Sequence, residues 1–406
     1  MEIHEFDDSS SDEDDFFIPR FVQVASTVMA DYFNDDCLYD DTHFRTRYRL
    51  SKNLFKRIAI DLNANFPCFQ LRWDARGRRG FTTYQKMTAA LRKLAYGVSA
   101  DALDEYLKMS ARVARESTYN FCQAIIRLYG PVYLRVPTKS DVDQLYAAHY
   151  TRHGFRGMLG SIDCTHVQWE RCPNAWRGQY TRGDHGHPTI MLEAVVSNDL
   201  WFWHVYFGMP GSNNDLNVLN ASPIFNQYLL GKAPDCPFVV NGNNYNYGYY
   251  LGDGIYPEYS TFVKAYQYPQ DEARKLFTKR QESARKDVER GFGVIKEKWH
   301  VIKYPCRTWD EDNIRLVMYA VLILHNMVIE DKGLNICTYN PNDNLNPAVT
   351  IQPATDAYFN KMLEIYDADT YHRLRHDLTV DIHARANEPN DYDQYEQDVG
   401  EDFYEI

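Results

Sequence analysis

The hydrophobic pattern divides the chain into a helical part and a part rich in strands. From about residue 21 to residue 150, apolar residues recur at helical spacing, most clearly at Met87, Leu91 and Leu94. From residue 155 onward, short apolar runs are bounded by glycine and turn residues, which is typical of buried strands. We therefore expect an α/β protein, with a helical region over 21–150 followed by a mixed sheet flanked by helices.

Cap residues refine the helical region. Gly97 follows one helix in the position of a C-terminal cap, and Ser110 is placed to cap a long helix that we expect to stop at Gly130. The helices within about 83–130 have the spacing of a helix-turn-helix unit, but an ordinary three-helix bundle has the same turns. Both interpretations stay open at this point.

The second part of the chain predicts a sheet domain over 151–332 and a C-terminal extension with a helix over 333–386. Three consecutive strands are expected in MLGSIDCTHVQW, PTIMLEAVVSND and LWFWHVYFGMPG. The segment NNDLNVLNASPIF then has a helical pattern, and YGYYLGDGIYP that of a short strand. Further helices are expected over 270–298, about 311–330 and roughly 355–385.

The net charge of −12 is concentrated at the two ends of the chain. Residues 1–19 and 386–406 carry eight acids each and no lysine or arginine, so we expect acidic disordered tails over 1–20 and 387–406. Without these tails, 40 acids face 44 bases, and the body carries about +4. A mildly basic body is compatible with DNA binding, which the whole-chain charge would argue against.

The cysteines indicate the redox compartment in which we expect the protein, and the apolar runs indicate whether it spans a membrane. The eight cysteines are scattered without a CxxC pair, which favours a reducing compartment and no zinc module. We find no apolar signal region at the N-terminus and no run of about 18 apolar residues, so we expect neither secretion nor a membrane span.

Two basic stretches are candidates for DNA contact, and a solvated or packed loop explains each of them equally well. In the first, RWDARGRRG, the candidates are Arg72, Arg76, Arg78 and Arg79. In the second, Trp169 and Trp176 accompany Arg171, Arg177 and Arg182.

Three carboxylates are candidates for metal-dependent phosphodiester chemistry. Such chemistry needs carboxylates that converge from separate elements, because cations must neutralise both the attacking and the leaving oxygen. Asp163 and Asp253 are expected at the ends of apolar strands, and Glu289 borders the apolar stripe of a long helix. In a chain with 56 acids this pattern alone is weak.

Other polar residues receive simpler interpretations. Asp215 precedes a helix, and we interpret it as an N-cap in preference to a fourth carboxylate. Cys164, His166 and Cys172 lack a fourth spaced ligand for a metal cluster. Asp287 and Glu282 share the long helix with Glu289, where we expect them to pair with neighbouring arginines and lysines.

Five motifs in series resemble the transposases of the Harbinger superfamily, in particular its plant-type branch. They are GSIDCTH, PGSNNDLNVLNASPIF, GYYLGDGIYPEYSTFV, ARKDVERGFGVIKEKW and LHNMVIED, within a similarity that runs from about Phe69 to Glu330. The resemblance implies an RNase H-like core with a catalytic Asp-Asp-Glu triad. On the matching motifs, that triad falls at Asp163, Asp253 and Glu289.

The resemblance also implies a function. The chain would be the catalytic subunit of a cut-and-paste DNA transposase, a metal-dependent endonuclease and strand transferase acting at terminal inverted repeats with two Mg²⁺ or Mn²⁺ ions. Its expected partners are DNA, a Myb-like accessory protein and further copies of itself, in the nucleus and without a membrane. The alternative is a domesticated, non-transposing descendant that acts as a nuclear DNA- or protein-binding factor.

Overall fold

The computed structural model describes residues 20–183, 186–343 and 350–386. Residues 1–19 and 387–406, on which the prediction of acidic disordered tails rests, lie outside the described residues.

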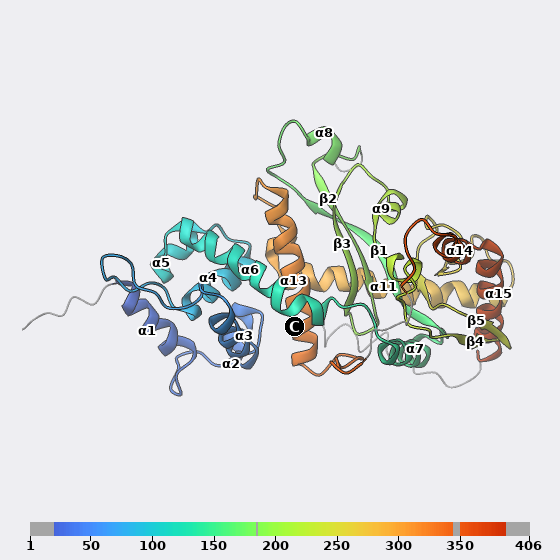
Figure 1. Cartoon of the computed structure of the whole chain (residues 1–406), viewed down its shortest axis with the longest axis horizontal. Coiled ribbons are helices and arrows are strands. Elements are labelled where there is room, and N and C mark those ends of the chain that lie inside the picture. Colours follow the sequence, from blue (N-terminus) through green and yellow to red (C-terminus); the bar gives the residue numbers. More distant parts are fainter. Residues whose placement is uncertain (1–19, 184–185, 344–349, 387–406) are drawn as a thin grey trace, which may run out of the picture.

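The first part of the chain forms helices that gather at one end of the molecule (Figure 1). Their bounds are α1 Arg20–Tyr32, α2 Asp41–Tyr48, α3 Lys52–Asn65, α4 Thr83–Tyr96, α5 Asp104–Leu107, α6 Ala111–Tyr133 and α7 Lys139–His153. A short 3₁₀ turn over Asp101–Leu103 precedes α5. The only β-type pairing described between residues 20 and 153 is an isolated bridge in the loop between α3 and α4.

Both predicted caps are present, but α6 is longer than expected. Gly97 ends α4 in the left-handed conformation with φ of 64°, and Ser110 accepts a hydrogen bond from the Val113 amide at the start of α6. The expected stop at Gly130 is wrong, because α6 continues through Pro131 to Tyr133.

Packing against another helix explains this extension. Gly130 lies against Ile323 of α13 (Glu311–Asp331), and the Tyr133 hydroxyl donates a hydrogen bond to Glu330 at the end of that helix. Proline removes a single backbone donor, and tertiary contacts of this kind outweigh the local preference to stop.

The three predicted long strands and the later short strand are confirmed, and they belong to one five-stranded sheet in the order β3-β2-β1-β6-β7. Their bounds are β1 Met158–Gln168, β2 Thr189–Val196, β3 Phe202–Pro210, β6 Tyr249–Leu251 and β7 Phe262–Val263. The pairs β1–β2 and β2–β3 are antiparallel, whereas β1–β6 and β6–β7 are parallel. A separate hairpin joins β4 (Phe238–Val240) to β5 (Asn243–Tyr245).

Helices cover both faces of the sheet, so the expected mixed sheet flanked by helices is confirmed. On one face lie α11 (Glu272–Lys298) and α13, and Ser161 of β1 donates a hydrogen bond of 3.1 Å to the Ala284 carbonyl of α11. The opposite face packs against α9, α10 and α14, where Ile162 belongs to an apolar cluster with Phe225 and Ile365. The remaining helices are α8 Arg177–Tyr180, α9 Asp215–Ala221, α10 Asn226–Leu229, α12 His300–Lys303, α14 Asp356–Ile365 and α15 Ala368–Ala384.

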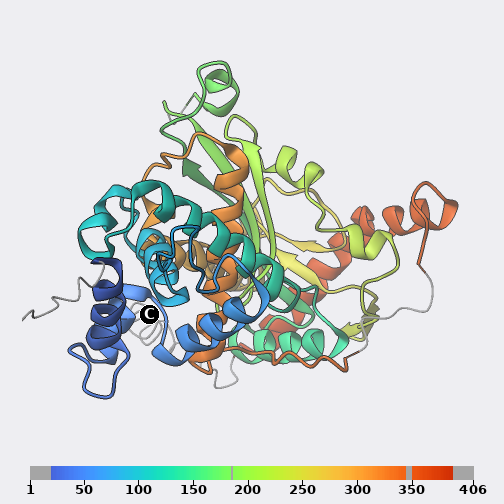
Figure 2. The same cartoon turned by 60° about the vertical axis from the view of Figure 1, so that its left-hand side comes forward.

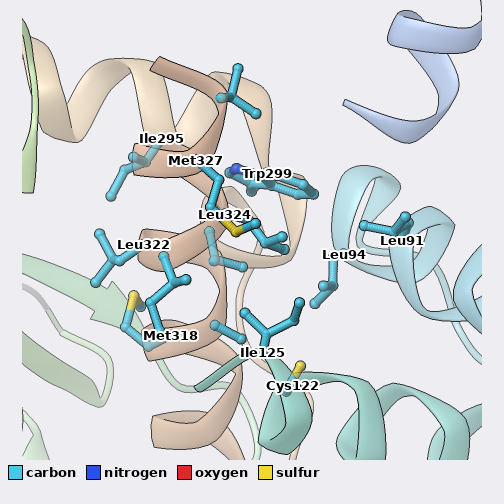
Figure 3. Packing of buried hydrophobic residues seen from close by; sticks show 14 of the residues in the cluster. Leu91, Leu94, Cys122, Ile125, Ile295, Trp299, Met318, Leu322, Leu324 and Met327 are labelled. Carbon is cyan, nitrogen blue, oxygen red and sulfur yellow. The ribbon is translucent and has the colours of Figure 1, made fainter. Parts of the chain in front are cut away.

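One hydrophobic core joins the helical end to the sheet. Figure 3 shows Leu94 of α4, Ile125 of α6, Trp299 after α11 and Leu324 of α13 packed around the same space, and all four are buried. Each buried side chain of this size contributes about 1.5–3 kcal/mol relative to an exposed one. The shared core fixes the helical end relative to the sheet, and the turned view in Figure 2 shows the same close arrangement.

Helix α13 is long and apolar enough, by length and composition, to cross a membrane. It nevertheless runs through the middle of the fold, and 67% of its apolar window is buried inside the protein. Helix α13 is therefore the core helix on which α6, β3 and α11 pack.

Candidate active site

Two adjacent parallel strands bring Asp163 and Asp253 to the same level of the sheet. Ser161 of β1 pairs with Leu251 of β6, and each aspartate lies two residues beyond its member of this pair. The expectation that Asp163 ends its strand is wrong, because β1 continues to Gln168. It is β6 that ends at Leu251, so its pairing with β1 stops at Ser161, two residues before Asp163. On the other side of β1, Asp163 pairs with Ala194 of β2.

The turn after β6 is anchored on both sides. The Gln281 side chain of α11 donates a hydrogen bond of 2.9 Å to the Gly252 carbonyl, and the Asp253 carboxylate accepts one of 2.9 Å from the Ile255 amide. A Cβ atom at Gly252 would lie 2.9 Å from the Tyr256 ring, closer than such contacts allow. Glycine therefore lets the ring close over the turn that positions Asp253.

Helix α11 brings Glu289 to this edge through an arginine. Arg285 Nη1 lies 3.0 Å from Asp163 Oδ2, and Arg285 Nη2 lies 2.8 Å from Glu289 Oε1. The predicted core-facing stripe is confirmed, since its members are all buried: Ala284, Val288, Ile295 and Trp299. One guanidinium thus links the first and third predicted carboxylates.

The surroundings of Asp163 raise the pKa of its carboxyl group. Burial raises the pKa of Asp163 to about 6, and the negative charges of Asp253 and Asp215 act in the same direction. The Cys164 amide, which donates to Asp163 at 2.8 Å, and the Arg285 guanidinium oppose this rise. Asp163 and Asp253 therefore repel each other across the strand pair, and a cation between them would relieve that repulsion.

Asp215 has a different position from the one predicted. The N-cap of α9 is Asn214, which accepts a hydrogen bond of 2.9 Å from the Asn217 amide, so the N-cap interpretation of Asp215 is wrong. The helix begins at Asp215, one residue earlier than an N-cap at Asp215 would require, so the Asp215 carboxylate does not cap it. Burial raises the pKa of Asp215, and the charge of Asp253 raises it further, which places Asp215 in the same acidic surroundings.

Two basic residues of α11 were missed by the sequence analysis as parts of the site. Besides Arg285, Lys296 donates a hydrogen bond of 2.8 Å to the Thr165 hydroxyl, one alternation along β1 from Asp163. Arg285, Glu289 and Lys296 are spaced by four and seven residues, which places them on one face of a helix. This spacing is visible in the sequence and could have predicted that both basic residues lie near Glu289.

Metal-ligand clusters are not preformed in the described ranges. Over residues 20–183, 186–343 and 350–386, no group of three histidine, cysteine or acidic side chains is arranged to hold a metal ion. The His166 ring contacts the Thr189 hydroxyl at 2.8 Å. Asp163 and Asp253 offer carboxylate oxygens, the donors that Mg²⁺ and Mn²⁺ prefer, while Arg285 occupies the space between Asp163 and Glu289.

Asp287, another acid of α11, has a structural role. Asp287 is fully buried, lies 2.8 Å from His153 and pairs with Arg290, which confirms the expected pairing with an arginine. Burial lowers the pKa of His153 to about 3, so its ring is neutral and donates to Asp287. Glu282 is exposed to solvent.

The two basic stretches lie in different places. Trp169 is fully buried and donates to the Thr308 carbonyl at 2.8 Å, so the start of the second stretch is a packed loop. Further along, Trp176 is exposed and Arg177 begins α8. The positive charge of Arg182 opposes the rise in the pKa of Asp215.

The first stretch is not brought to the carboxylates. Its arginines lie in the loop between α3 and α4, at the helical end of the molecule (Figures 1 and 2). This loop is separate from the sheet edge that carries Asp163.

Comparisons with known proteins identify the family to which the chain is related. Residues 131–335 match the family model "Plant transposon protein", and residues 26–63 match a domain of unknown function, DUF8418. The chain is similar to "Protein ALP1-like" of Arabidopsis thaliana, with 23% identity over 311 residues that cover 73% of each chain. No solved structure matches.

Proposed function

The chain belongs to the plant transposon protein family, and from this premise we propose that it is the catalytic subunit of a cut-and-paste DNA transposase. In this function it is an endonuclease and strand transferase at transposon terminal inverted repeats. The observation that carries the proposal is the register of β1 and β6, which sets Asp163 level with Asp253, while α11 ties Glu289 to Asp163 through Arg285.

The strand order supports an RNase H-like core. Three antiparallel strands are followed by two strands parallel to the first, with α11 across one face. In this arrangement, residues near the middle of β1 and at the end of β6 share one edge, which is where the two aspartates lie.

Asp163, Asp253 and Glu289 would hold two divalent ions, Mg²⁺ or Mn²⁺. When bound, such ions supply positive charge that activates water and neutralises phosphate oxygens. Arg285 pairs with both Asp163 and Glu289, so cation binding would compete with its guanidinium for the same carboxylate oxygens. Lys296, with its ammonium group beside Thr165, adds positive charge for a DNA phosphate next to the carboxylates.

The reaction has two steps. Hydrolysis breaks the bond between phosphorus and the 3′ oxygen at the element end, with the water oxygen joining phosphorus and a proton passing to the freed 3′ hydroxyl. That hydroxyl then attacks a phosphodiester of a short AT-rich target and displaces the target's own 3′ hydroxyl. The arginines of both basic stretches would contact the DNA phosphates on either side.

Partners and location follow the same proposal. A Myb-like accessory protein would help to recognise the DNA and to bring the chain into the nucleus. Pairing of two element ends requires a homo-oligomer. The helix-turn-helix-like unit at α4–α6 would bind DNA or the accessory protein.

A cleavage assay tests this function. Purified protein, with and without a Myb-like partner, is incubated with labelled terminal-repeat DNA and Mg²⁺ or Mn²⁺, alongside Asp253→Ala. We expect metal-dependent cleavage that the variant loses. Equal cleavage by both proteins would exclude this triad as the catalytic group.

A second function, DNA or protein binding without cleavage, is favoured by one observation. Within the described ranges the carboxylates form no ready group of three ligands, and Arg285 pairs with two of them. Retained DNA or partner binding without cleavage in the same assay would select this domesticated role.

A further inference from the structure

The loop between α3 and α4 forms a small ordered hairpin, which we call the arginine hairpin (residues 72–80). Trp73 and Arg79 form an antiparallel bridge, and the Gly80 amide donates a hydrogen bond of 2.8 Å to the Arg72 carbonyl. Gly77, with φ of 71°, turns the chain at the tip. The loop therefore has a defined shape before it meets any ligand.

Asp74 holds this shape from inside. Its carboxylate accepts hydrogen bonds of 2.9 Å from the amides of both Arg76 and Arg78, and of 2.7 Å from Arg78 Nε. The Arg78 contacts and the Arg76 amide lower the pKa of Asp74, so the carboxylate is ionised and its charge is used within the turn. The one acid of the hairpin is thus occupied by the backbone and by Arg78.

The remaining charge of the hairpin faces solvent. Within the part of the chain that the structure describes, Arg72, Arg76 and Arg79 form no ion pair. Burial lowers the pKa of the neighbouring Lys86, and the Arg72 guanidinium lowers it further, which shows how closely positive charge is gathered here.

An aromatic ring stands among these arginines. The Trp73 side chain is 65% exposed, although a large apolar ring gains free energy from burial. Residues opposite each other in an antiparallel bridge share a face, so the Trp73 ring and the Arg79 guanidinium project on the same side.

We propose that the arginine hairpin binds DNA at unpaired bases, with Trp73 stacking on an exposed base and the free arginines on the flanking phosphates. A ring that stacks needs a base face, which intact duplex hides, whereas a gap or a distorted strand offers it. The inference rests on the proposed function, from which DNA follows as the ligand. It places a DNA-binding element in a different region from the carboxylates proposed to cleave DNA.

A matched pair of tryptophans tests the stacking. Trp309 is 66% exposed, nearly the same as Trp73, but acidic residues follow it: Asp310, Glu311 and Asp312. Binding is measured on the full chain carrying Asp253→Asn, so that cleavage plays no part, with a short duplex and with the same duplex interrupted by a gap containing 2-aminopurine.

We expect tighter binding to the gapped DNA and quenching of the 2-aminopurine fluorescence. Trp73→Ala should lose about tenfold or more in affinity for the gapped DNA and none for the intact duplex, while Trp309→Ala changes neither. Asp74→Ala, which loosens the turn but keeps the ring, should weaken the gap preference in part.

The outcomes separate this inference from the proposed function. Binding to both DNAs that is indifferent to Trp73 would overturn the inference and leave the proposed function standing. A protein that binds neither DNA would overturn both. Polyglutamate that competes as well as single-stranded DNA of equal charge would show a site for acidic protein and would also overturn the inference.

Discussion

Arginines are used in opposite ways at the two ends of this molecule. At the sheet edge, Arg285 contacts two carboxylates at 3.0 and 2.8 Å, so its charge is neutralised within the protein. In the arginine hairpin, Arg72, Arg76 and Arg79 have no acidic partner in the described parts of the chain, and a single aspartate serves the turn. The same type of side chain is paired with carboxylates in one region and has no acidic partner among the described residues in the other.

Under the proposed function, this difference separates two tasks, DNA cleavage and DNA binding. A carboxylate site needs its charges held close together, and an internal guanidinium keeps them so until cations bind. A DNA-contacting surface needs charges that are free to pair with phosphates, because released counterions then favour binding. Breaking each region in turn should therefore affect cleavage and binding separately.

The largest effect is expected at the sheet edge. Asp163→Asn removes a carboxylate charge with little change in shape, so strand cleavage should fall roughly a thousandfold or more. Affinity for terminal-repeat DNA and the thermal unfolding midpoint should stay near the values of the unmodified protein. Cleavage is measured with labelled DNA and Mn²⁺, and full nicking by this variant would reject the assignment.

A change at the buried acid Asp287 of α11 should lower the stability of the fold. Asp287→Ala leaves Arg290 and the neutral His153 without their shared acceptor, so the free energy of unfolding should fall by about 3 kcal/mol. Denaturant unfolding measures this loss, with the exposed Glu282→Ala as control, expected within about 0.5 kcal/mol of the unmodified protein. Equal losses in both variants would remove the distinction between structural and functional acids on α11.

Proton competition gives a third, smaller effect. The pKa of Asp163 is raised to about 6, so below that pH the folded protein holds a proton where a cation would bind. Affinity for Mn²⁺ should therefore fall up to about tenfold for each pH unit below 6 and level off above it. Calorimetric titration measures this slope, and a pH-independent affinity between 5 and 7 would argue against Asp163 as a ligand.

The smallest effect is expected in the arginine hairpin. Arg76→Ala should weaken binding to any DNA severalfold and reduce the slope of log affinity against log salt by about one unit. Arg274→Ala is the matched control, because Arg274 already pairs with Asp271. The same slope for the unmodified protein, Arg76→Ala and Arg274→Ala would mean that Arg76 makes no phosphate contact.

The sequence and the structure agree best where the local pattern is strong. Alternation and apolar runs predicted all three long strands and the helix that carries Glu289, because burial of one face dictates the period. The stop of α6 at Gly130 and the N-cap role of Asp215 were wrong, since contacts with Ile323 and a one-residue shift of the helix start decided them. Local signals of glycine and aspartate do not record such long-range contacts.

By itself, the sequence determined the α/β pattern and, through motif resemblance, predicted three carboxylates as one site. Tertiary structure alone decided that β6 ends beside Asp163, that Arg285 links Asp163 to Glu289, and that Trp73 stands exposed among arginines. The physical reason is that periodicity reports which face of an element is buried, whereas strand register and ion pairing depend on elements far apart in the chain.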